Sequence, residues 1–282
     1  MSGPARALVI DNWVTIFLYC ARSETTTIRT IIEEEIMKSI IIAAFCLLAA
    51  TASAVEIKVI SGGAVEPGLE AFAQLVRRDL GHELKILYNT APQIAKRLSA
   101  GEVYDILVSP PATIETAIGE GKVVPETRVK VGRVGAGIIV RTGAPFPDVA
   151  TVDALKQALL DADSVVYNTA STGIYLDKLF ATMGISEALK AKTTRYPTGA
   201  AVMEHAIKGK GKEIGFGAMT EIRLYEPKGI RLVGPLPAAI QNYTNYEAVL
   251  MTGATAADAA RAVLRHLVTP TVKAAFTAGG VE

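Results

Sequence analysis

The residues best suited to bind a ligand are small or hydroxylated side chains in loops that each lead into a predicted helix. The first N–H groups of a helix have no partner within it and carry about half a unit of positive charge, so an anion binds there when small side chains let it approach. Any single loop of this kind can equally serve only to cap its helix, but several in one protein favour a shared anion site. The predicted ligand-binding residues, in or beside these loops, are Gly63, Ala64, Thr90, Ala91, Ser109, Ser171, Thr172, Gly173, Thr198, Gly199, Ala200, Met219 and Thr220.

No motif for a metal, a nucleotide or a serine nucleophile competes with this interpretation. The sequence has no G-x-x-x-x-G-K-[ST], no G-x-S-x-G and no H-E-x-x-H, and His82, His205 and His266 are far apart in it. Residues 209–212 (GKGK) follow a predicted helix instead of opening one, so we interpret them as a solvated turn. We therefore expect no cofactor, no metal site and no conventional hydrolase.

Composition narrows the class of protein further. The chain has 29 Lys and Arg against 28 Asp and Glu, and this balance lacks the clustered basic footprint of a nucleic-acid partner. Hydrophobic residues make up 50% of it, which is enough for a sizeable core. Both cysteines, Cys20 and Cys46, precede residue 55, so we expect no disulfide in the remainder. We expect a monomer that binds no nucleic acid.

A secretory signal peptide is predicted inside the chain rather than at its start. Residues 37–38 (MK) supply a basic n-region, residues 40–50 an apolar run, and residues 52–54 (ASA) a small-residue cleavage site. The run is shorter than the about 20 residues that a membrane-spanning helix needs. We predict cleavage between Ala54 and Val55 and a protein that works in the periplasm.

Strand and helix patterns alternate after residue 55. Short apolar runs at 56–60, 83–87 and 105–108 indicate strands, each followed by a loop and an amphipathic helix, and a second series of this kind begins near residue 152. This order is typical of mostly parallel sheets flanked by helices. We predict an over-extended start or, alternatively, a disordered extension at 1–36, a signal peptide at 37–54, one lobe from 55–140 with 246–282, and a second lobe from 141–245.

Residues 55–282 resemble the periplasmic molybdate-binding protein family. Residues 101–109 (GEVYDILVS) are similar to the family's G-x-x-x-D-[IVL]-x-[IVL]-S, and residues 173–175 match its G-I-Y; further points of resemblance are 59–68, 88–98 and 214–221. The resemblance implies an α/β, two-lobed type II periplasmic-binding-protein fold in which each lobe is a mostly parallel sheet flanked by helices, with two hinge crossings. It also implies the substrate-binding component of an ABC importer, which passes a small anion to a membrane permease.

The loops depart from the family where it holds its oxyanion. The family uses serine hydroxyls in the first two loops and a tyrosine after the late strand; these positions fall here on Ala64, on Thr90 or Ala91, and on about Ala218. Fewer side-chain donors and more space favour an organic carboxylate over molybdate. A register shifted by one residue would instead restore Ser61 or Thr90 as a ligand.

Two classes of function lead, and a sensory lobe that reports a ligand to a membrane partner is a third alternative. The leading hypothesis is a binding protein that closes on a molybdate-type oxyanion or an organic carboxylate; Arg141 and Arg195 are candidates for a bidentate contact to a carboxylate. Some proteins that resemble this family are aconitate isomerases, in which a general base moves a proton in the same cleft. For that chemistry we would assign Glu66 first and Tyr175 second, although Glu66 also suits a first-turn charge that complements the helix dipole.

Overall fold

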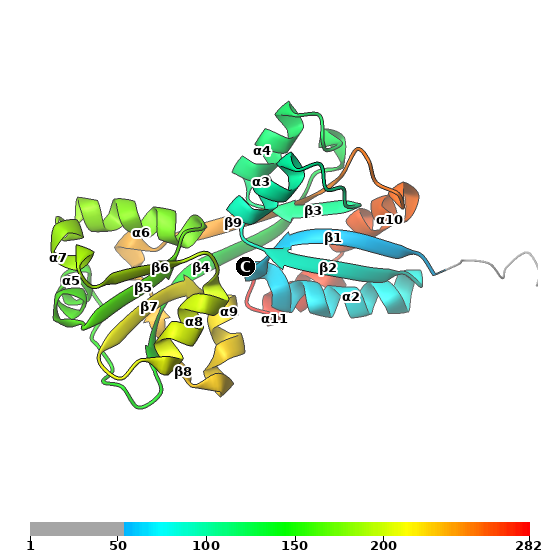
Figure 1. The fold of residues 1–282 in the computed structure, drawn as a ribbon. Coiled ribbons are helices and arrows are strands. Elements are labelled where there is room, and N and C mark those ends of the chain that lie inside the picture. Colours follow the sequence, from blue (N-terminus) through cyan, green and yellow to red (C-terminus); the bar gives the residue numbers. More distant parts are fainter. Residues whose placement is uncertain (1–53) are drawn as a thin grey trace, which may run out of the picture. The chain divides into compact units, whose positions relative to one another are not determined.

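One long strand joins two sheets in residues 54–282, the part of the chain that the computed structural model describes (Figure 1). The predicted extension (1–36) and all but the last residue of the predicted signal peptide (37–54) lie outside the described residues. The strands are β1 (Glu56–Gly62), β2 (Glu83–Asn89), β3 (Ile106–Ser109), β4 (Val129–Arg141), β5 (Ser164–Asn168), β6 (Thr193–Tyr196), β7 (Glu213–Ala218), β8 (Ile230–Pro235) and β9 (Tyr243–Leu250). They follow the order β2-β1-β3-β9-β4-β7-β5-β6, with β8 also paired to β4.

Helices cover both faces of each sheet. The α-helices are α2 (Glu66–Leu80), α3 (Ala91–Ser99), α4 (Pro111–Gly119), α5 (Val152–Asp161), α6 (Ser171–Thr182), α7 (Ser186–Lys190), α8 (Gly199–Lys208), α9 (Met219–Tyr225), α10 (Ala257–Leu267) and α11 (Pro270–Ala278). Short 3-10 turns lie at η1 (Gly63–Val65), η2 (Pro125–Thr127), η3 (Glu226–Lys228) and η4 (Ala238–Ile240). Among residues 54–282 none of these helices is both long and apolar enough to cross a membrane.

The first lobe packs two apolar layers on its sheet, which contains β1, β2, β3, β9 and the first half of β4. Ile57 and Val59 of β1 point to the layer under α2, α10 and α11, while Ile60 points to the opposite layer under α3 and α4. This alternation follows from the two-residue period of a strand. Because β1, β2 and β3 run parallel, the helices that follow them all begin at one edge of the sheet.

The second lobe repeats this arrangement around β5, β6, β7, β8 and the second half of β4. Phe216 of β7 packs with α5, α6 and α7, and Ile139 of β4 packs on the other face with Met203 of α8 and Ile222 of α9. Strands β5, β6 and β7 are parallel, so α6, α8 and α9 also begin at one sheet edge. The predicted fold class, two mostly parallel sheets flanked by helices in two lobes, is confirmed.

β4 passes from one lobe to the other without a break. It pairs with β9 as far as Gly135 and with β7 from Ala136 onward. The change of partner therefore comes a few residues before the predicted lobe limit at residue 140. The chain returns after η4 and enters β9 at Tyr243, close to the predicted limit at residue 245.

Asp105, the aspartate of the 101–109 pattern, has a structural role. Its buried carboxylate accepts hydrogen bonds from Lys58 N at 2.8 Å and from Ala256 N at 2.8 Å. It thereby ties β1 to the residue that precedes α10. Buried carboxylates need such donors because an unpaired one is costly.

Candidate anion-binding site

First turns of helices from both lobes meet at one small pocket of about 40 Å³. It lies at the carboxyl ends of β1, β2, β5, β6 and β7, where η1, α3, α6, α8 and α9 respectively begin. The residues around it are Gly62, Gly63, Ala64, Asn89, Thr90, Ala91, Pro110, Asn168, Ala170, Ser171, Thr172, Gly199, Ala218, Glu221 and Tyr246. None of these is Lys, Arg or His, so the positive potential of the site comes from backbone N–H groups at helix starts.

Seven of the predicted ligand-binding residues line this pocket: Gly63, Ala64, Thr90, Ala91, Ser171, Thr172 and Gly199. The other six lie next to lining residues in the sequence, but do not line it: Ser109, Gly173, Thr198, Ala200, Met219 and Thr220. The predicted loops at residues 62–64, 89–91, 171–173 and 198–200 thus each contribute to one pocket.

Two of the predicted threonines act as helix caps. Thr198 Oγ1 accepts a hydrogen bond from Ala201 N at 3.2 Å, which satisfies one of the free N–H groups at the start of α8. Thr90 and Gln93 form a capping box at α3, in which Thr90 N donates to Gln93 Oε1 at 2.9 Å. Capping and ligand binding are compatible for Thr90, which lines the pocket, whereas Thr198 serves its helix alone.

Asn168, at the end of β5, organises the start of α6. Its Oδ1 accepts hydrogen bonds from Ala170 N at 3.0 Å and Gly173 N at 3.2 Å, which leaves the Nδ2 hydrogens for a ligand or water. The turn is so tight that a Cβ on Gly173 would overlap the Asn168 carbonyl oxygen. This approach explains why glycine opens the G-I-Y segment.

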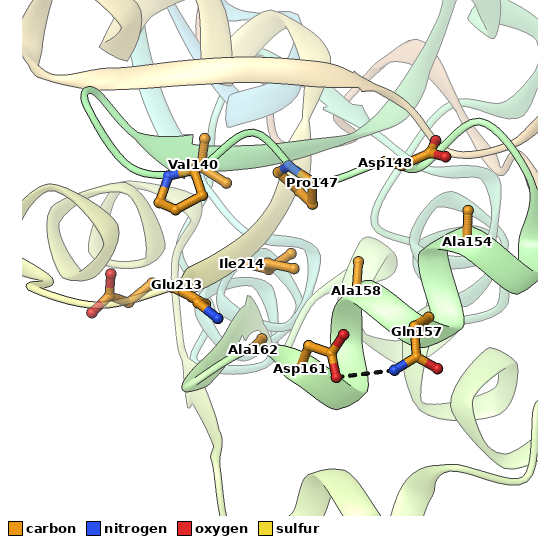
Figure 2. A pocket seen from close by; sticks show the side chains of 12 residues that line it. Val140, Pro147, Asp148, Ala154, Gln157, Ala158, Asp161, Ala162, Glu213 and Ile214 are labelled. Atoms are coloured by element: carbon orange, nitrogen blue, oxygen red, sulfur yellow. Dashed lines mark hydrogen bonds between the residues drawn. The ribbon is translucent and has the colours of Figure 1, made fainter.

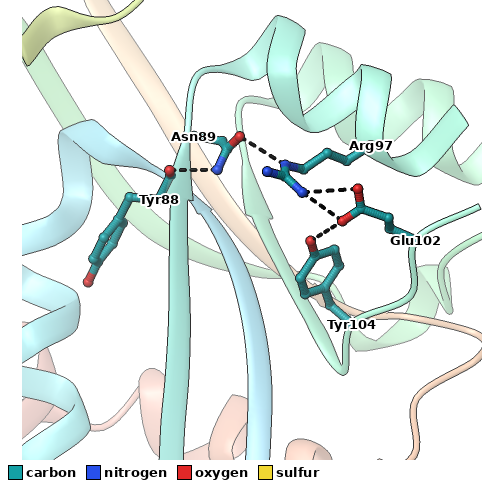
Figure 3. Close-up of polar contacts among 5 residues, drawn as sticks. All are labelled: Tyr88, Asn89, Arg97, Glu102 and Tyr104. Atoms are coloured by element: carbon teal, nitrogen blue, oxygen red, sulfur yellow. Dashed lines mark hydrogen bonds and ion pairs between the residues drawn. The ribbon is translucent and has the colours of Figure 1, made fainter. Parts of the chain in front are cut away.

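Asn89, which ends β2, is held by hydrogen bonds to both polar atoms of its amide, from partners that do not line the pocket (Figure 3). Its Nδ2 donates to Tyr88 O at 2.6 Å, and Arg97 Nε donates to its Oδ1 at 3.2 Å. Arg97 also forms an ion pair with Glu102 at 2.9 Å. Glu102 therefore neutralises the charge of Arg97 outside the pocket. Arg97 orients the Asn89 side chain and adds no positive charge to the pocket.

Among the residues that line the pocket, Glu221 is the one with an ionisable carboxyl group. It lies in the first turn of α9 and retains some solvent exposure. A Cβ on Gly63 would be 2.9 Å from its Oε1, and a Cβ on Gly199 would collide with its Oε2. Its carboxyl thus stands between the first turns of η1 in one lobe and α8 in the other. Burial, and secondarily the charge of Glu66, raise the pKa of Glu221 to about 7.

Tyr246 of β9 also lines the pocket, beside Glu221. It is 7% exposed, and its ring lies across Gly62 so closely that a Cβ there would be 2.6 Å from Cε1. Burial, and then the neighbouring charge of Glu221, raise the pKa of the Tyr246 phenol. A tyrosine therefore lines the pocket, although it comes from β9 and not from the segment after the late strand.

The residues proposed for enzyme chemistry and for a bidentate contact lie elsewhere. Glu66 starts α2 without lining the pocket; burial, then Glu70, raise the pKa of its carboxyl, and Lys228 opposes them. Tyr175 donates its hydroxyl to Ile240 O at 2.6 Å. Arg195 pairs with Asp177 at 3.0 Å, and Arg141 donates to Thr142 O at 3.1 Å.

Asn89, Asn168, Glu221 and Tyr246 were not among the predicted residues. Asn168 had a signal, since Asn at the end of a strand before a helix is a typical cap. Glu221 had an ambiguous one, because an acidic residue in a first turn usually only complements the helix dipole. No sequence signal pointed to Tyr246, because its place in the pocket depends on which strands β9 pairs with.

A larger cavity of about 400 Å³ lies within the second lobe (Figure 2). Its wall between α5, β4 and β7 is mainly apolar, with Val140, Ala158 and Ile214, and Gln157 donates to Asp161 at its edge at 2.9 Å. No set of helix starts converges there, so size alone does not make it the ligand site.

The two-lobed fold, with a pocket formed by helix starts from both lobes, defines a solute-binding protein of the type II class. Residues 57–282 match the model of the bacterial extracellular solute-binding protein family, and the chain belongs to this family. The predicted resemblance is thereby confirmed.

The individual proteins that this chain resembles share less than about a third of their aligned residues with it. The chain is 28% identical to an aconitate isomerase of Pseudomonas sp. over 231 residues, which is 79% of this chain and 86% of that protein. The periplasmic molybdate-binding protein of Azotobacter vinelandii superposes with a TM-score of 0.66 at 15% identity, over 80% of this chain and 98% of that one. PEB3 bound to L-phospholactate superposes with a TM-score of 0.63 at 14% identity, over 79% and 98%. At such identities the two structures establish the shared fold.

Proposed function

We propose that this protein captures a small organic anion, a carboxylate, between its lobes and delivers it to the permease of an ABC importer. The observation that supports this is the meeting of helix starts from both lobes at one pocket without a cationic side chain. An anion that contacts η1 and α3 on one side and α6 and α8 on the other stabilises the closed arrangement only while it is bound.

A carboxylate suits the pocket better than a tetrahedral oxyanion. Ala64, Ala91 and Ala218 line the pocket without the hydroxyl groups that the related family uses for its oxyanion, and Glu221 lines it too. A protonated carboxyl and a carboxylate share a strong O–H···O⁻ hydrogen bond. PEB3, a protein of the same fold, binds L-phospholactate, a small organic anion that carries both a carboxylate and a phosphate.

A thermal-shift panel tests this proposal. Purified protein is titrated with trans-aconitate, propane-1,2,3-tricarboxylate, L-phospholactate, molybdate and sulfate. A ligand at 100 times its Kd adds about 2.7 kcal/mol of stability, which raises Tm by about 5–10 °C in a protein of this size. We expect the largest shift with a carboxylate. Absence of a shift with every probe contradicts anion capture, and a shift with molybdate alone contradicts the carboxylate.

The place of action and the partner are part of the same proposal. The family's description as extracellular supports export, and we propose the periplasm, with cleavage between Ala54 and Val55. N-terminal sequencing of the exported protein is expected to begin at Val55. A peptide from residues 1–36 on the mature protein contradicts the predicted over-extended start. Gel filtration of that material is expected to give a monomer.

A second candidate function is isomerisation of aconitate. Two observations favour it: the 28% identical relative is an aconitate isomerase, and Glu221 stands in the pocket with a pKa near neutrality, as a general base requires. A base would remove a proton from the methylene carbon, the charge would spread over the allylic system, and the proton would return to its other end. The sequence favoured Glu66 and Tyr175 for this role, but Glu221 is the better-placed base.

Incubation with trans-aconitate in D2O separates the two functions. An isomerase forms cis-aconitate and incorporates deuterium at carbon, and Glu221→Gln abolishes both. A binding protein leaves the isomer and its C–H bonds unchanged while binding remains measurable by calorimetry.

A further inference from the structure

Glu221 occupies the place where an anion would meet the start of α8. Its Oε2 lies against Gly199 of the second lobe and its Oε1 against Gly63 of the first. In residues 54–282 its carboxyl has neither a salt bridge nor a hydrogen bond. An anion held by both lobes must therefore contact this carboxyl or displace it.

The groups around Glu221 offer it little positive charge. The titratable side chains that interact electrostatically with Glu221 are Glu66 on α2, Tyr225 on α9 and Tyr246 on β9. Arg223, the cation of α9 itself, lies beside Gly280 after α11, and Lys228 on η3 acts on Glu66. Lys228 Nζ lies 4.0 Å from the centre of the Tyr225 ring. The parts of β4, β7 and β8 that pack against α9 are apolar. An ionised Glu221 beside a bound anion would thus be an unpaired like charge.

A proton on Glu221 removes this conflict. Two carboxylates in one pocket cannot both remain ionised without a large cost, and one of them gains a proton. The protonated group then donates a short hydrogen bond to the other. The raised pKa of free Glu221 means that this proton is readily acquired near neutral pH.

We propose that Glu221 contacts the ligand as a protonated carboxyl, so that capture at alkaline pH takes up one proton and ligands are selected for an oxygen that accepts the hydrogen bond. This inference rests on the proposed anion capture. It adds a specificity-determining residue to the site and couples ligand capture to pH.

Calorimetry with propane-1,2,3-tricarboxylate, which has no double bond to isomerise, tests the proposal; molybdate is the second probe. Affinity for the tricarboxylate is expected to be nearly constant between pH 6 and 7, and to fall about tenfold per pH unit above that. At pH 8, titrations in HEPES and in Tris, which differ in ionisation enthalpy, are expected to report uptake of nearly one proton.

Two substitutions at Glu221 test whether its carboxyl donates a hydrogen bond to the ligand or only occupies the space that the ligand needs. Glu221→Gln keeps a hydrogen-bond donor of the same shape, so it is expected to retain binding at pH 6 and to lose the pH dependence. Glu221→Ala lacks the donor and is expected to bind about tenfold more weakly at pH 6. Glu187→Gln removes an exposed carboxyl of α7, away from the pocket, and serves as the control that keeps the wild-type pH profile. Circular dichroism and Tm establish that each variant is folded.

The outcomes separate this inference from the proposed function. Binding that is independent of pH, without proton uptake, overturns the role of Glu221 and leaves anion capture intact. Tighter binding by Glu221→Ala shows that the carboxyl only competes with the ligand and also overturns it. Failure of both probes to bind at pH 6 contradicts anion capture, and this inference with it.

Discussion

At the scale of single residues, Glu221 links folding stability to pH. Its pKa is about 7 in the folded protein against 4.5 for an ordinary glutamate, so its contribution to stability is present below pH 4.5 and is lost as pH rises to about 7. We expect Glu221→Gln to be more stable than wild type by about 3 kcal/mol at pH 8 and similar to it at pH 4.5. Urea denaturation of both proteins at the two pH values measures this, and equal differences at both contradict it.

Gly199 is the residue whose small size makes room for that carboxyl. Gly199→Ala places a methyl group against Glu221 Oε2 and is expected to weaken propane-1,2,3-tricarboxylate binding about 5- to 150-fold, since overpacking of this kind costs about 1–3 kcal/mol. A methyl group on Gly234 meets nothing within 4 Å, so Gly234→Ala is the matched control. Calorimetry gives the Kd of each variant. If Gly199→Ala and Gly234→Ala have the same Kd, a methyl group at residue 199 does not interfere with binding.

At the scale of elements, the start of α6 depends on the Asn168 side chain. Asn168→Ala leaves two backbone N–H groups without their acceptor and is expected to destabilise the fold by about 1–3 kcal/mol. Asn168→Asp keeps the acceptor but adds negative charge to the pocket, so it should fold normally and lose anion affinity. Tm and Kd measured on both variants test this division. If Asn168→Asp binds as well as wild type, Asn168 does not face the ligand.

Local patterns predicted most of the elements but only part of the site. The helix α2 was evident because Leu69, Phe72 and Val76 repeat at helical spacing. Strand β6 was not predicted, because its sequence TTRY is polar and it lies at the edge of the sheet without a fully buried residue. Loops before helices revealed half of the lining residues. Tyr246 escaped because no local pattern shows that β9 inserts between β3 and β4.

At the scale of the whole described molecule, α9 connects the lobes. It follows β7 of the second lobe, yet Thr220 Oγ1 donates a hydrogen bond of 2.5 Å to Ala64 O of the first. Thr220→Val removes this donor and leaves a buried carbonyl unpaired, at a cost of about 1–3 kcal/mol to the closed arrangement. We expect a larger radius of gyration without ligand by X-ray scattering, and a Kd raised about 5- to 100-fold. An unchanged scattering profile would show that other contacts hold the lobes.

The lining of the pocket by backbone N–H groups, without a lysine or arginine among its residues, has a consequence for the surroundings in which the protein works. Mobile ions screen exposed charges within about 10 Å at 0.1 M ionic strength, but act much less on buried partial charges. The full chain has a formal net charge of only +1, so there is also little long-range field for salt to weaken. The affinity for the ligand and the association rate should therefore vary little with salt concentration. This is an advantage for a binding protein outside the cytoplasm, where the cell does not control the salt concentration.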